Sequence, residues 1–364
     1  MAQKTVIVGA GVIGASIAFH LARAGAKVVV IEQDQPAGGA SGSSFGWINA
    51  SFYLSPAHFH LRHAAMAAHR RLAQLLPDVG YRWTGTLWFE QQGLPLEQMA
   101  KALAACDYPQ RIVSRSEVQT LEPKLHDAPD QALLFAQEGA VDAADLTRAL
   151  LSAAQGLGAA VHLGLGAQSL IQAGGRIVGL ATAQGPILAD HVIIAAGVGS
   201  PALLRDIGLD LPMVPRPGLI VQTAPVPWRL NHILVSPVHE IRQDAMGRLL
   251  APAVSNHQAD TAPTVADPQA DTQATLENLR RLFAAPRIAL DRFAIANRPV
   301  PADGLPVIGA AAPGLSLAVM HSGVTLAALV GEGVAAEVLG APDTPLFAQF
   351  RFARFAGQAV GPRG

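Results

Sequence analysis

Wholly apolar runs recur along the chain and predict its buried strands. Lys4–Val8 reads as a short strand that passes through glycines into a helical pattern, and residues 27–31 follow as a second strand. Residues 191–196 have the same apolar character, and Leu315–Val319 predicts a further strand. Strands of this kind are typical of parallel sheets with both faces covered. The pattern therefore predicts an α/β fold.

Other segments follow helical or alternating periods. Helical spacing predicts helices at residues 58–76, 96–106, 116–121, 142–157, 275–283 and 324–339. Alternation predicts strands at 81–90, within 161–187, at 219–223, and a hairpin of 240–243 with 248–251. The strands at 219–223, 240–243 and 248–251 would form a separate antiparallel sheet. Composition predicts loops at the Gly/Ser-rich stretch 36–52 and at the polar stretch 255–272, the latter a mobile surface loop.

Length and hydropathy bound the architecture. With 364 residues the chain exceeds one comfortable core, so two domains are expected. Apolar residues make up 50% and mean hydropathy is +0.30, yet charges, glycines or prolines interrupt every run before it reaches membrane-spanning length. We therefore expect a large core and no integral membrane segment. The apolar N-terminus is explained as a strand and helix, so no targeting segment is predicted.

Cysteine count and charge exclude several classes of function. Cys106 is the single cysteine, which excludes an intrachain disulfide, favours the reducing cytoplasm and leaves no cysteine-based metal site. The 26 basic and 27 acidic residues give a net charge of −1, so no overall field favours nucleic acid or an anionic membrane. We expect a small-molecule partner and no metal, and the oligomeric state stays open.

The first apolar strand leads into residues 9–14, Gly-Ala-Gly-Val-Ile-Gly, which have the GxGxxG spacing of a dinucleotide-binding turn. Gly9 allows the tight turn, Gly11 lets a pyrophosphate approach bare backbone, and Gly14 lets the helix pack closely on the strand. The helix N-terminus then faces the phosphates. Glu32 ends the second strand, where a carboxylate accepts hydrogen bonds from ribose hydroxyls and disfavours the 2′-phosphate of NADP. Dinucleotide binding is therefore predicted, with FAD and NAD both open.

Four motifs spread over the whole chain resemble the FAD-dependent D-amino-acid oxidase family, which includes glycine oxidase and sarcosine oxidase. They are the glycine turn with Glu32, the Gly-Ser loop at 39–44, the strand and turn at 190–200, and the stretch 298–309 followed by residues 321–323 and a helix. Their shared order and spacing make the resemblance specific. FAD, and not NAD, explains the last two motifs.

The resemblance implies a discontinuous fold, because the FAD-binding motifs lie at both ends and in the middle of the chain. A Rossmann-type FAD-binding domain would comprise residues 1–46, 142–216 and 296–364. An inserted substrate domain of α+β type, built on an antiparallel sheet, would comprise residues 47–141 and 217–295. The strand pattern described above agrees with this division.

We expect FAD to be bound non-covalently. Cys106 falls in the presumed insert, and Phe45 and Gly46, not a histidine, follow the Gly-Ser loop. Backbone N–H groups at the start of the last helix would stabilise negative charge on reduced flavin. The predicted cofactor contacts are Gly9, Gly11, Val12, Ile13, Gly14, Glu32, Gln33, Ala40, Ser41, Ser43, Ser44, Gln168, Ala196, Gly197, Gly199, His321, Gly323, Val324 and Thr325.

The resemblance also implies a reaction. In this family the flavin takes a hydride equivalent from a carbon next to an amine, and water hydrolyses the resulting imine. The expected substrate is a small amino acid: a D-amino acid, glycine, or a secondary or N-methyl amino acid. Because the cofactor performs the hard step, the protein must supply a cationic clamp for the substrate carboxylate, the correct orientation and a dry pocket.

Arg298 is the predicted carboxylate clamp. A guanidinium fork grips a carboxylate through two parallel hydrogen bonds, and the position matches the family's carboxylate-binding arginine. The structural alternative is an arginine that caps the turn before Asp303. His321 opens the last helix where glycine oxidase has a second arginine, so the chain departs from that pattern. His321 would donate a hydrogen bond to the flavin or the substrate, or titrate near neutral pH. The structural alternative is a histidine that caps the helix or packs against it.

Further pocket residues are expected around the predicted hairpin, where the family places pocket-lining side chains. His239, Glu240 and Arg242 are the candidates. A period of two puts Glu240 and Arg242 on one face and His239 on the other, and which face meets the flavin stays open. The aromatic residues after the Gly-Ser loop would wall the pocket or belong to the core: Trp47, Phe52 and Tyr53.

The electron acceptor would be O2, a protein or a quinone. Sarcosine oxidase-like enzymes carry a lysine near the flavin that assists oxygen, whereas lysines here occur only at positions 4, 27, 101 and 124. This weakens an oxygen-using oxidase and leaves room for a dehydrogenase. One alternative is the flavoprotein subunit of a multi-chain amine or proline-type dehydrogenase. Another is an NAD-binding dehydrogenase or a non-catalytic nucleotide module.

Overall fold

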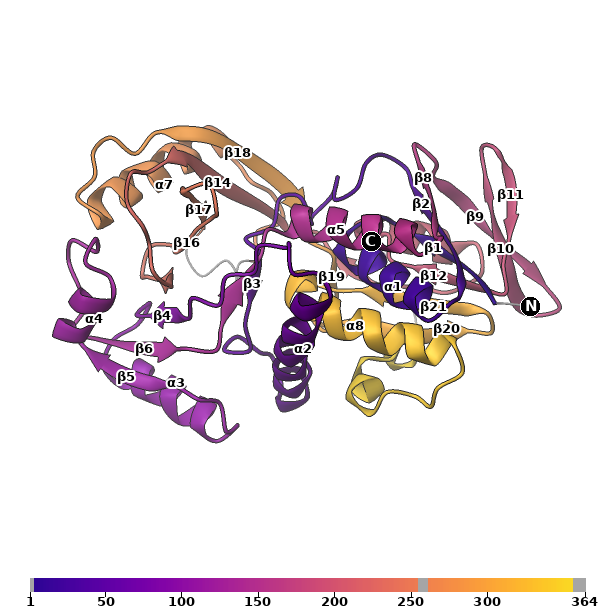
Figure 1. Ribbon diagram of the computed structural model, residues 1–364, viewed down its shortest axis with the longest axis horizontal. Coiled ribbons are helices and arrows are strands. Elements are labelled where there is room, and N and C mark those ends of the chain that lie inside the picture. The colour runs from indigo at the N-terminus through magenta and orange to yellow at the C-terminus, as the bar shows by residue number, and fades with distance from the viewer. Residues whose placement is uncertain (1–2, 255–260, 356–364) are drawn as a thin grey trace, which may run out of the picture.

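The computed structural model describes residues 3–254 and 261–355 and places two large β-sheets at opposite ends of the molecule (Figure 1). Helix α2 (Pro56–Leu75) lies between the two ends, with its apolar face buried. Ser55 caps this helix by accepting a hydrogen bond from the backbone N–H of His58. Residues that contact α2 therefore come from both halves of the structure.

The main sheet is formed by the apolar strands that the sequence predicts. Its members are β1 (Lys4–Val8), β2 (Lys27–Glu32), β8 (Ala160–Leu163), β12 (His191–Ile194), β20 (Val307–Ala312) and β21 (Leu315–Val319). They lie in the order β20-β21-β12-β1-β2-β8, and the neighbours are parallel except for β20, which is antiparallel to β21. The strands come from three separate parts of the chain.

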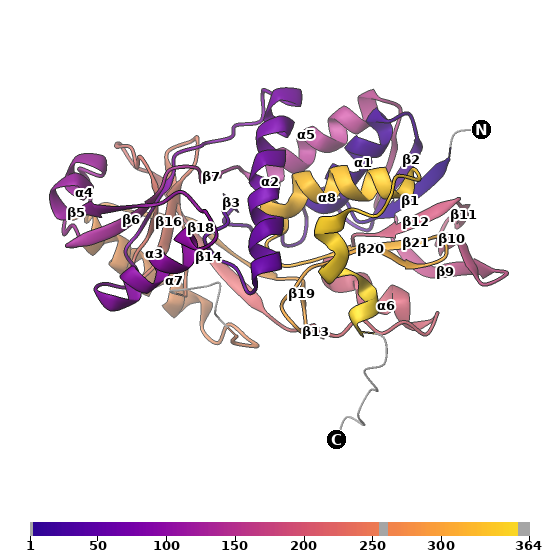
Figure 2. The same cartoon turned by 90° about the horizontal axis from the view of Figure 1, so that it is seen from below.

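Both faces of the main sheet are covered (Figure 2). One face is packed by the helices α1 (Val12–Arg23), α5 (Ala143–Gly156) and α8 (Gly323–Val338). The other face meets α6 (Ser200–Arg205) and a small sheet of β9 (Ala167–Ala173), β10 (Arg176–Thr182) and β11 (Gly185–Leu188). Along β1, Ile7 belongs to the core on the helix side, whereas Val6 and Val8 belong to the other core, as the period of two requires.

The second large sheet is antiparallel apart from one parallel pair. Its members are β4 (Thr86–Trp88), β5 (Arg111–Ser114), β6 (Gln131–Phe135), β14 (Pro217–Pro225), β15 (Ile233–Val235), β16 (Glu240–Gln243), β17 (Arg248–Pro252) and β18 (Leu290–Asn297). The order is β18-β14-β17-β16-β15-β4-β6-β5, with β15 and β4 parallel. Helix α7 (Pro268–Leu282) shares a core with one face of this sheet, and α3 (Leu94–Ala104) shares a core with the other.

Short elements complete the structure. Two small ribbons lie where the chain passes between the two halves (Figure 2): β3 (Trp47–Ile48) with β7 (Gly139–Ala140), and β13 (Met213–Val214) with β19 (Val300–Pro301). The short helices are α4 (Arg115–Leu121), η1 (Gly197–Gly199), η2 (Pro345–Phe350) and η3 (Phe352–Phe355). Ser114 and Glu117 form a capping box that starts α4 where the sequence predicts a capped helix.

Three predicted segments differ from the structure. The predicted loop at 255–272 is wrong from residue 268 onward, because α7 begins at Pro268, where Asp267 caps the helix and proline is suited to its first turn. Residues 255–260 lie outside the described residues. The predicted strand at 81–90 is reduced to β4, since Arg82 forms only an isolated bridge. The predicted loop at 36–52 contains the short strand β3.

The α/β fold class is confirmed, and the strands predicted within 161–187 divide between the main sheet and the small sheet. Across the described part of the chain, no helix combines the length and apolar character needed to cross a bilayer. Residues 3–254 and 261–355 also contain no group of three or more His, Cys, Asp or Glu side chains arranged to hold a metal ion.

Candidate active site

A cavity of about 910 Å³ lies where the main sheet meets the second sheet. Its wall includes the ends of β1 and β2, at Val8 and Ile31, and residues of the second sheet such as Ile220 and Ile295. Ligands of open α/β sheets bind at the carboxyl ends of the parallel strands. The cavity is therefore in the position where such a fold places its ligand.

The glycine turn forms a tight and bare part of the cavity. Gly9 has φ +106°, its N–H donates to the Ile31 carbonyl at 2.8 Å, and an added Cβ would lie 2.5 Å from the Ala195 carbonyl oxygen. A Cβ on Gly14 would overlap the Gly9 carbonyl oxygen. Gly9 is therefore required by the turn and Gly14 by the contact of α1 with β1.

Polar groups around this turn are held by backbone hydrogen bonds. Ser41 Oγ, in the Gly-Ser loop, accepts from the Val12 N–H at the start of α1 at 3.0 Å. The Glu32 carboxylate accepts from the Ala10 N–H at 2.8 Å and from the Asp34 N–H at 3.0 Å. Both side chains line the cavity. A bare turn at a positive helix end, next to an oriented carboxylate, fits the pyrophosphate and ribose of a dinucleotide.

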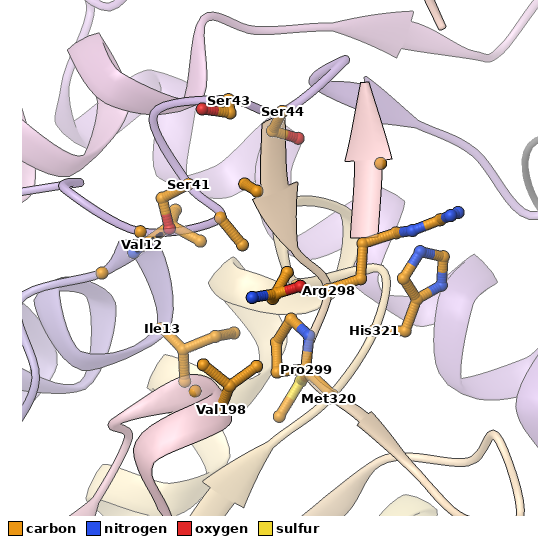
Figure 3. A pocket seen from close by; sticks show the side chains of 18 of the residues that line it. Val12, Ile13, Ser41, Ser43, Ser44, Val198, Arg298, Pro299, Met320 and His321 are labelled. Carbon is orange, nitrogen blue, oxygen red and sulfur yellow. Dashed lines mark hydrogen bonds between the residues drawn. The ribbon is translucent and has the colours of Figure 1, made fainter. Parts of the chain in front are cut away.

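The structure brings nearly all predicted cofactor contacts together. Every one of them lines the cavity except Gly14, which packs beneath the turn. Figure 3 shows Val12 and Ile13 on one side of the cavity, with the side chains of Ser41, Ser43 and Ser44 on the loop above. Gln168, at the beginning of β9, is also part of the wall. Their placement is compatible with a cofactor that runs through the cavity.

The start of α8 closes another side of the cavity. Ser322 precedes the helix in a left-handed conformation with φ +58°, and Val324 and Thr325 line the cavity. Thr325 Oγ1 donates to the Trp47 carbonyl at 2.9 Å. The positive end of a 16-residue helix therefore lies at the cavity wall.

Arg62 and Asn49 line the cavity but are absent from the sequence prediction. Arg62, on α2, is 2% exposed, and its NH1 donates to Ser322 Oγ at 2.7 Å. Its Nε donates to the Asn49 carbonyl at 3.2 Å, and its NH2 donates to Asn49 Oδ1. The sequence contains one signal for this role, since Arg62 interrupts the buried stripe that includes Phe59 and Met66 at helical spacing.

A second side chain of α2 also holds the start of α8. His69 Nε2 contacts the Val324 carbonyl at 2.8 Å, and Nδ1 contacts Tyr81 Oη at 3.1 Å. Because a carbonyl only accepts, Nε2 carries the proton and Nδ1 accepts from Tyr81. Burial lowers the pKa of His69 to about 4, so the ring is neutral at neutral pH.

A buried carboxylate supports the adjoining wall. Glu138 accepts hydrogen bonds from Trp47 Nε1 at 3.0 Å, from Tyr108 Oη at 2.9 Å and from the Ser51 N–H at 3.3 Å. Burial raises the pKa of Glu138, and the hydrogen bonds from Ser51 and Tyr108 oppose that shift. Trp47 lines the cavity, whereas Phe52 stands edge-on to it with ring centroids 5.4 Å apart and is not part of the lining. Glu138 therefore fixes the Trp47 ring from behind.

Arg298 and His321 lie in the cavity wall with side chains directed toward one another (Figure 3). Arg298 Nε donates to the Arg216 carbonyl at 3.1 Å, and its NH2 donates to the Pro217 carbonyl at 2.8 Å. These bonds fix the orientation of the guanidinium. His321 Nδ1 lies 3.3 Å from Ser322 Oγ, the hydroxyl that Arg62 also contacts. The arrangement places cationic and hydrogen-bonding groups beside the start of α8.

The comparisons with known proteins agree with this geometry. A family model described as FAD dependent oxidoreductase, the DAO family, matches residues 4–337. The chain belongs to this family. It is 29% identical over 374 residues to a D-amino acid dehydrogenase of Rhizobium rhizogenes, a match that covers 85% of this chain and 88% of the relative.

Solved structures of the FAD-dependent oxidoreductase fold superpose over almost the whole chain. Glycine oxidase from Geobacillus kaustophilus has a TM-score of 0.87 and 26% identity, with 97% of this chain and 99% of that chain covered. L-proline dehydrogenase from P. horikoshii has a TM-score of 0.85, 19% identity and coverage of 97% and 98%. The latter likeness concerns the fold alone. The family match identifies the protein as an FAD-dependent oxidoreductase.

The hairpin candidates do not reach the cavity wall in this oxidoreductase. His239 is buried below α7, where its Nδ1 contacts the Pro252 carbonyl at 2.9 Å and Asn278 Nδ2 donates to its Nε2 at 3.0 Å. Glu240 is 1% exposed and also lies outside the lining. Arg242 Nε donates to the carbonyl of Phe45, the residue that follows the Gly-Ser loop. Burial lowers the pKa of Arg242 to about 10.

Proposed function

We propose that the protein oxidises the C–N bond of a small amino acid, with non-covalently bound FAD as the hydride acceptor. The candidate substrates are D-amino acids, glycine and secondary or N-methyl amino acids. The observation that carries the proposal is the orientation of Arg298, held by two backbone carbonyls at the wall of the cavity that also contains the dinucleotide turn. A fixed guanidinium is suited to orient a carboxylate.

The residues that would hold FAD are those of the turn, the Gly-Ser loop and the start of α8. Gly9 and Gly11 offer bare backbone for the pyrophosphate, and Glu32 would accept from the ribose hydroxyls. Bound FAD supplies a two-electron acceptor that the side chains lack. The family name specifies FAD, so the NAD alternative has no support from the comparisons.

The chain's own groups would bind and orient the substrate. Arg298 would grip the carboxylate, since a planar guanidinium presents its donors in a fork that matches the two oxygens of a carboxylate. His321 would donate to the substrate or the flavin. A substrate amine that enters neutral requires no side-chain base, and water would hydrolyse the imine product to a carbonyl compound and ammonia or an amine.

We also propose the domain division into an FAD-binding part, residues 1–46, 142–216 and 296–364, and an inserted substrate part, residues 47–141 and 217–295. It follows the membership of the strands in the two large sheets. The cavity between these sheets would then combine cofactor contacts from one part with substrate contacts from the other.

A dehydrogenase is favoured over an oxidase by one specific observation. The four lysines lie at positions 4, 27, 101 and 124, and none of them lines the cavity. The lysine that assists oxygen in sarcosine oxidase-like enzymes therefore has no counterpart at this wall. Electrons would pass to a protein or a quinone, either from this chain alone or from a multi-chain assembly.

The visible spectrum of the purified protein, before and after anaerobic addition of candidate amino acids, tests the proposal. We expect the protein to show a flavin spectrum that bleaches with at least one D-amino acid, glycine, sarcosine or proline. Denaturation should release the flavin, because it is bound non-covalently. Admitting air then separates the acceptors, because slow return of the oxidised spectrum indicates a dehydrogenase. A flavin spectrum that no such compound bleaches refutes the substrate class, and a protein without flavin refutes the cofactor.

A further inference from the structure

Arg62 is a buried cation at the wall of the cavity. Its guanidinium bonds to the Ser322 hydroxyl and to the carbonyl and side-chain oxygens of Asn49, all of which are neutral acceptors. Within the described part of the chain, no carboxylate lies within ion-pair distance of it, 4.0 Å. Glu138 is the carboxylate that affects the pKa of Arg62, and it is already bonded to Trp47, Tyr108 and Ser51.

The charge of Arg62 persists despite its burial. Desolvation lowers its pKa to about 10, which leaves the guanidinium protonated at neutral pH. A buried cation without an ion-pair partner is costly unless another negative charge compensates it. Because Arg62 lines the cavity, a ligand that carries or develops negative charge there would supply that compensation.

The position of Arg62 adds its charge to a helix end. Ser322, which it holds, precedes α8, and this residue provides no side-chain cap to the first turn of the helix. Val324 and Thr325 of that turn line the same cavity. The guanidinium and the positive end of α8 therefore act on the same region.

We propose that Arg62 is a positioning residue whose charge, held at the start of α8, stabilises negative charge on the ring of bound FAD and so favours its reduction. This rests on the proposed function, because it requires FAD in the cavity with its ring at the start of α8. A purely structural Arg62 would only join α2 to α8, and its charge would have no effect on the flavin.

Sulfite titration of the FAD-loaded protein tests the proposal without the substrate reaction. The sulfur lone pair of sulfite forms a bond to the oxidised ring, and the ring takes up the negative charge, so no further oxidant or reductant is needed. The dissociation constant, read from the loss of flavin absorbance, measures how well the site stabilises that charge. The midpoint potential of the flavin provides a second readout.

Substitutions of Arg62 should separate charge from structure. We expect Arg62→Gln to weaken sulfite binding about tenfold or more, as for unit charges several ångströms apart in a partly buried site, and to lower the midpoint potential. Arg62→Lys keeps the charge and should retain most of the affinity. Arg71→Gln is the matched control, because Arg71 is an exposed arginine of α2 that bonds to Glu332 of α8, far from its start. It should leave both readouts unchanged.

Asn49→Asp provides a test that does not remove the arginine. It keeps an oxygen acceptor for Arg62 and adds a negative charge beside it. We expect a loss of sulfite affinity comparable to that of Arg62→Gln, even if the latter variant does not fold. Unchanged affinity in Asn49→Asp, or equal losses in Arg62→Lys and Arg62→Gln with FAD bound, overturns the proposal. A wild-type protein without FAD overturns the proposed function and this inference with it.

Discussion

Replacing Arg298 with methionine tests the proposed substrate contact most directly. The change keeps an apolar stem of similar length and removes every guanidinium donor. A hydrogen bond to a charged partner contributes about 1.5–3 kcal/mol, so losing a two-bond clamp should cost about 3 kcal/mol or more, equivalent to about a 100-fold fall in kcat/KM. The rise in KM should carry most of this loss, because the carboxylate is not the reacting group.

The decisive comparison is between an amino acid and the amine formed by removing its carboxylate. If Arg298 grips the carboxylate, the wild-type protein prefers the amino acid strongly, and Arg298→Met loses most of that preference while its flavin stays bound. Arg292→Met is the matched control, since Arg292 lies on β18, the strand that Arg298 directly follows, and is outside the cavity lining. Steady-state kinetics with an artificial electron acceptor give the ratio of kcat/KM for the amino acid to kcat/KM for the amine in each of the three proteins. An amino-acid preference that survives in Arg298→Met refutes the assignment.

Three further outcomes are expected. Gly14→Ala should lower Tm and FAD content, because its Cβ overlaps the Gly9 carbonyl, whereas Gly156→Ala, a helical position with open space, should do neither; normal FAD content in Gly14→Ala would contradict the turn geometry. Glu32→Gln should weaken FAD binding by about 1 kcal/mol, measured by titrating the apoprotein, through loss of a charge-assisted hydrogen bond. Burial lowers the pKa of His69 to about 4, below its value in the unfolded chain. The contribution of neutral His69 to the free energy of unfolding is therefore full above pH 6.5 and is lost as pH falls toward 4. That is a loss of about 2 kcal/mol between pH 7 and pH 5, so His69→Gln should flatten the fall of unfolding free energy with acid, and an unchanged slope would exclude this role.

The parts of the site that were predictable are those encoded locally. The glycine turn, Ser41 and Glu32 follow from short motifs whose spacing has one structural meaning, and the structure places them around the same cavity. The buried strands were equally predictable, because a strand in a sheet covered on both faces has apolar residues at successive positions. Element boundaries failed where a polar stretch hid a helix start, as at Pro268.

The parts that were not predictable depend on contacts between distant segments. Arg62 and Ser322 are 260 residues apart in the chain, and His69 and Val324 are 255 apart. The period of α2 indicates that these side chains face inward, but it contains no information about which element they meet. For His239, Glu240 and Arg242 the period of two was correct but could not show which face of β16 pointed at the cavity, and the structure packs all three elsewhere.

The two helices that pack on α8 do so in different ways, and the difference bears on function. Against α1, close approach depends on Gly331, where any Cβ would overlap Ser16 Oγ. Against α2, the contact at the start of α8 instead uses buried polar groups, Arg62 and His69. Buried polar groups are a costly means of joining helices when apolar packing would serve. Arg62 and His69 both meet α8 at the end that lies at the cavity, which is what a site that must stabilise charge on its ligand requires.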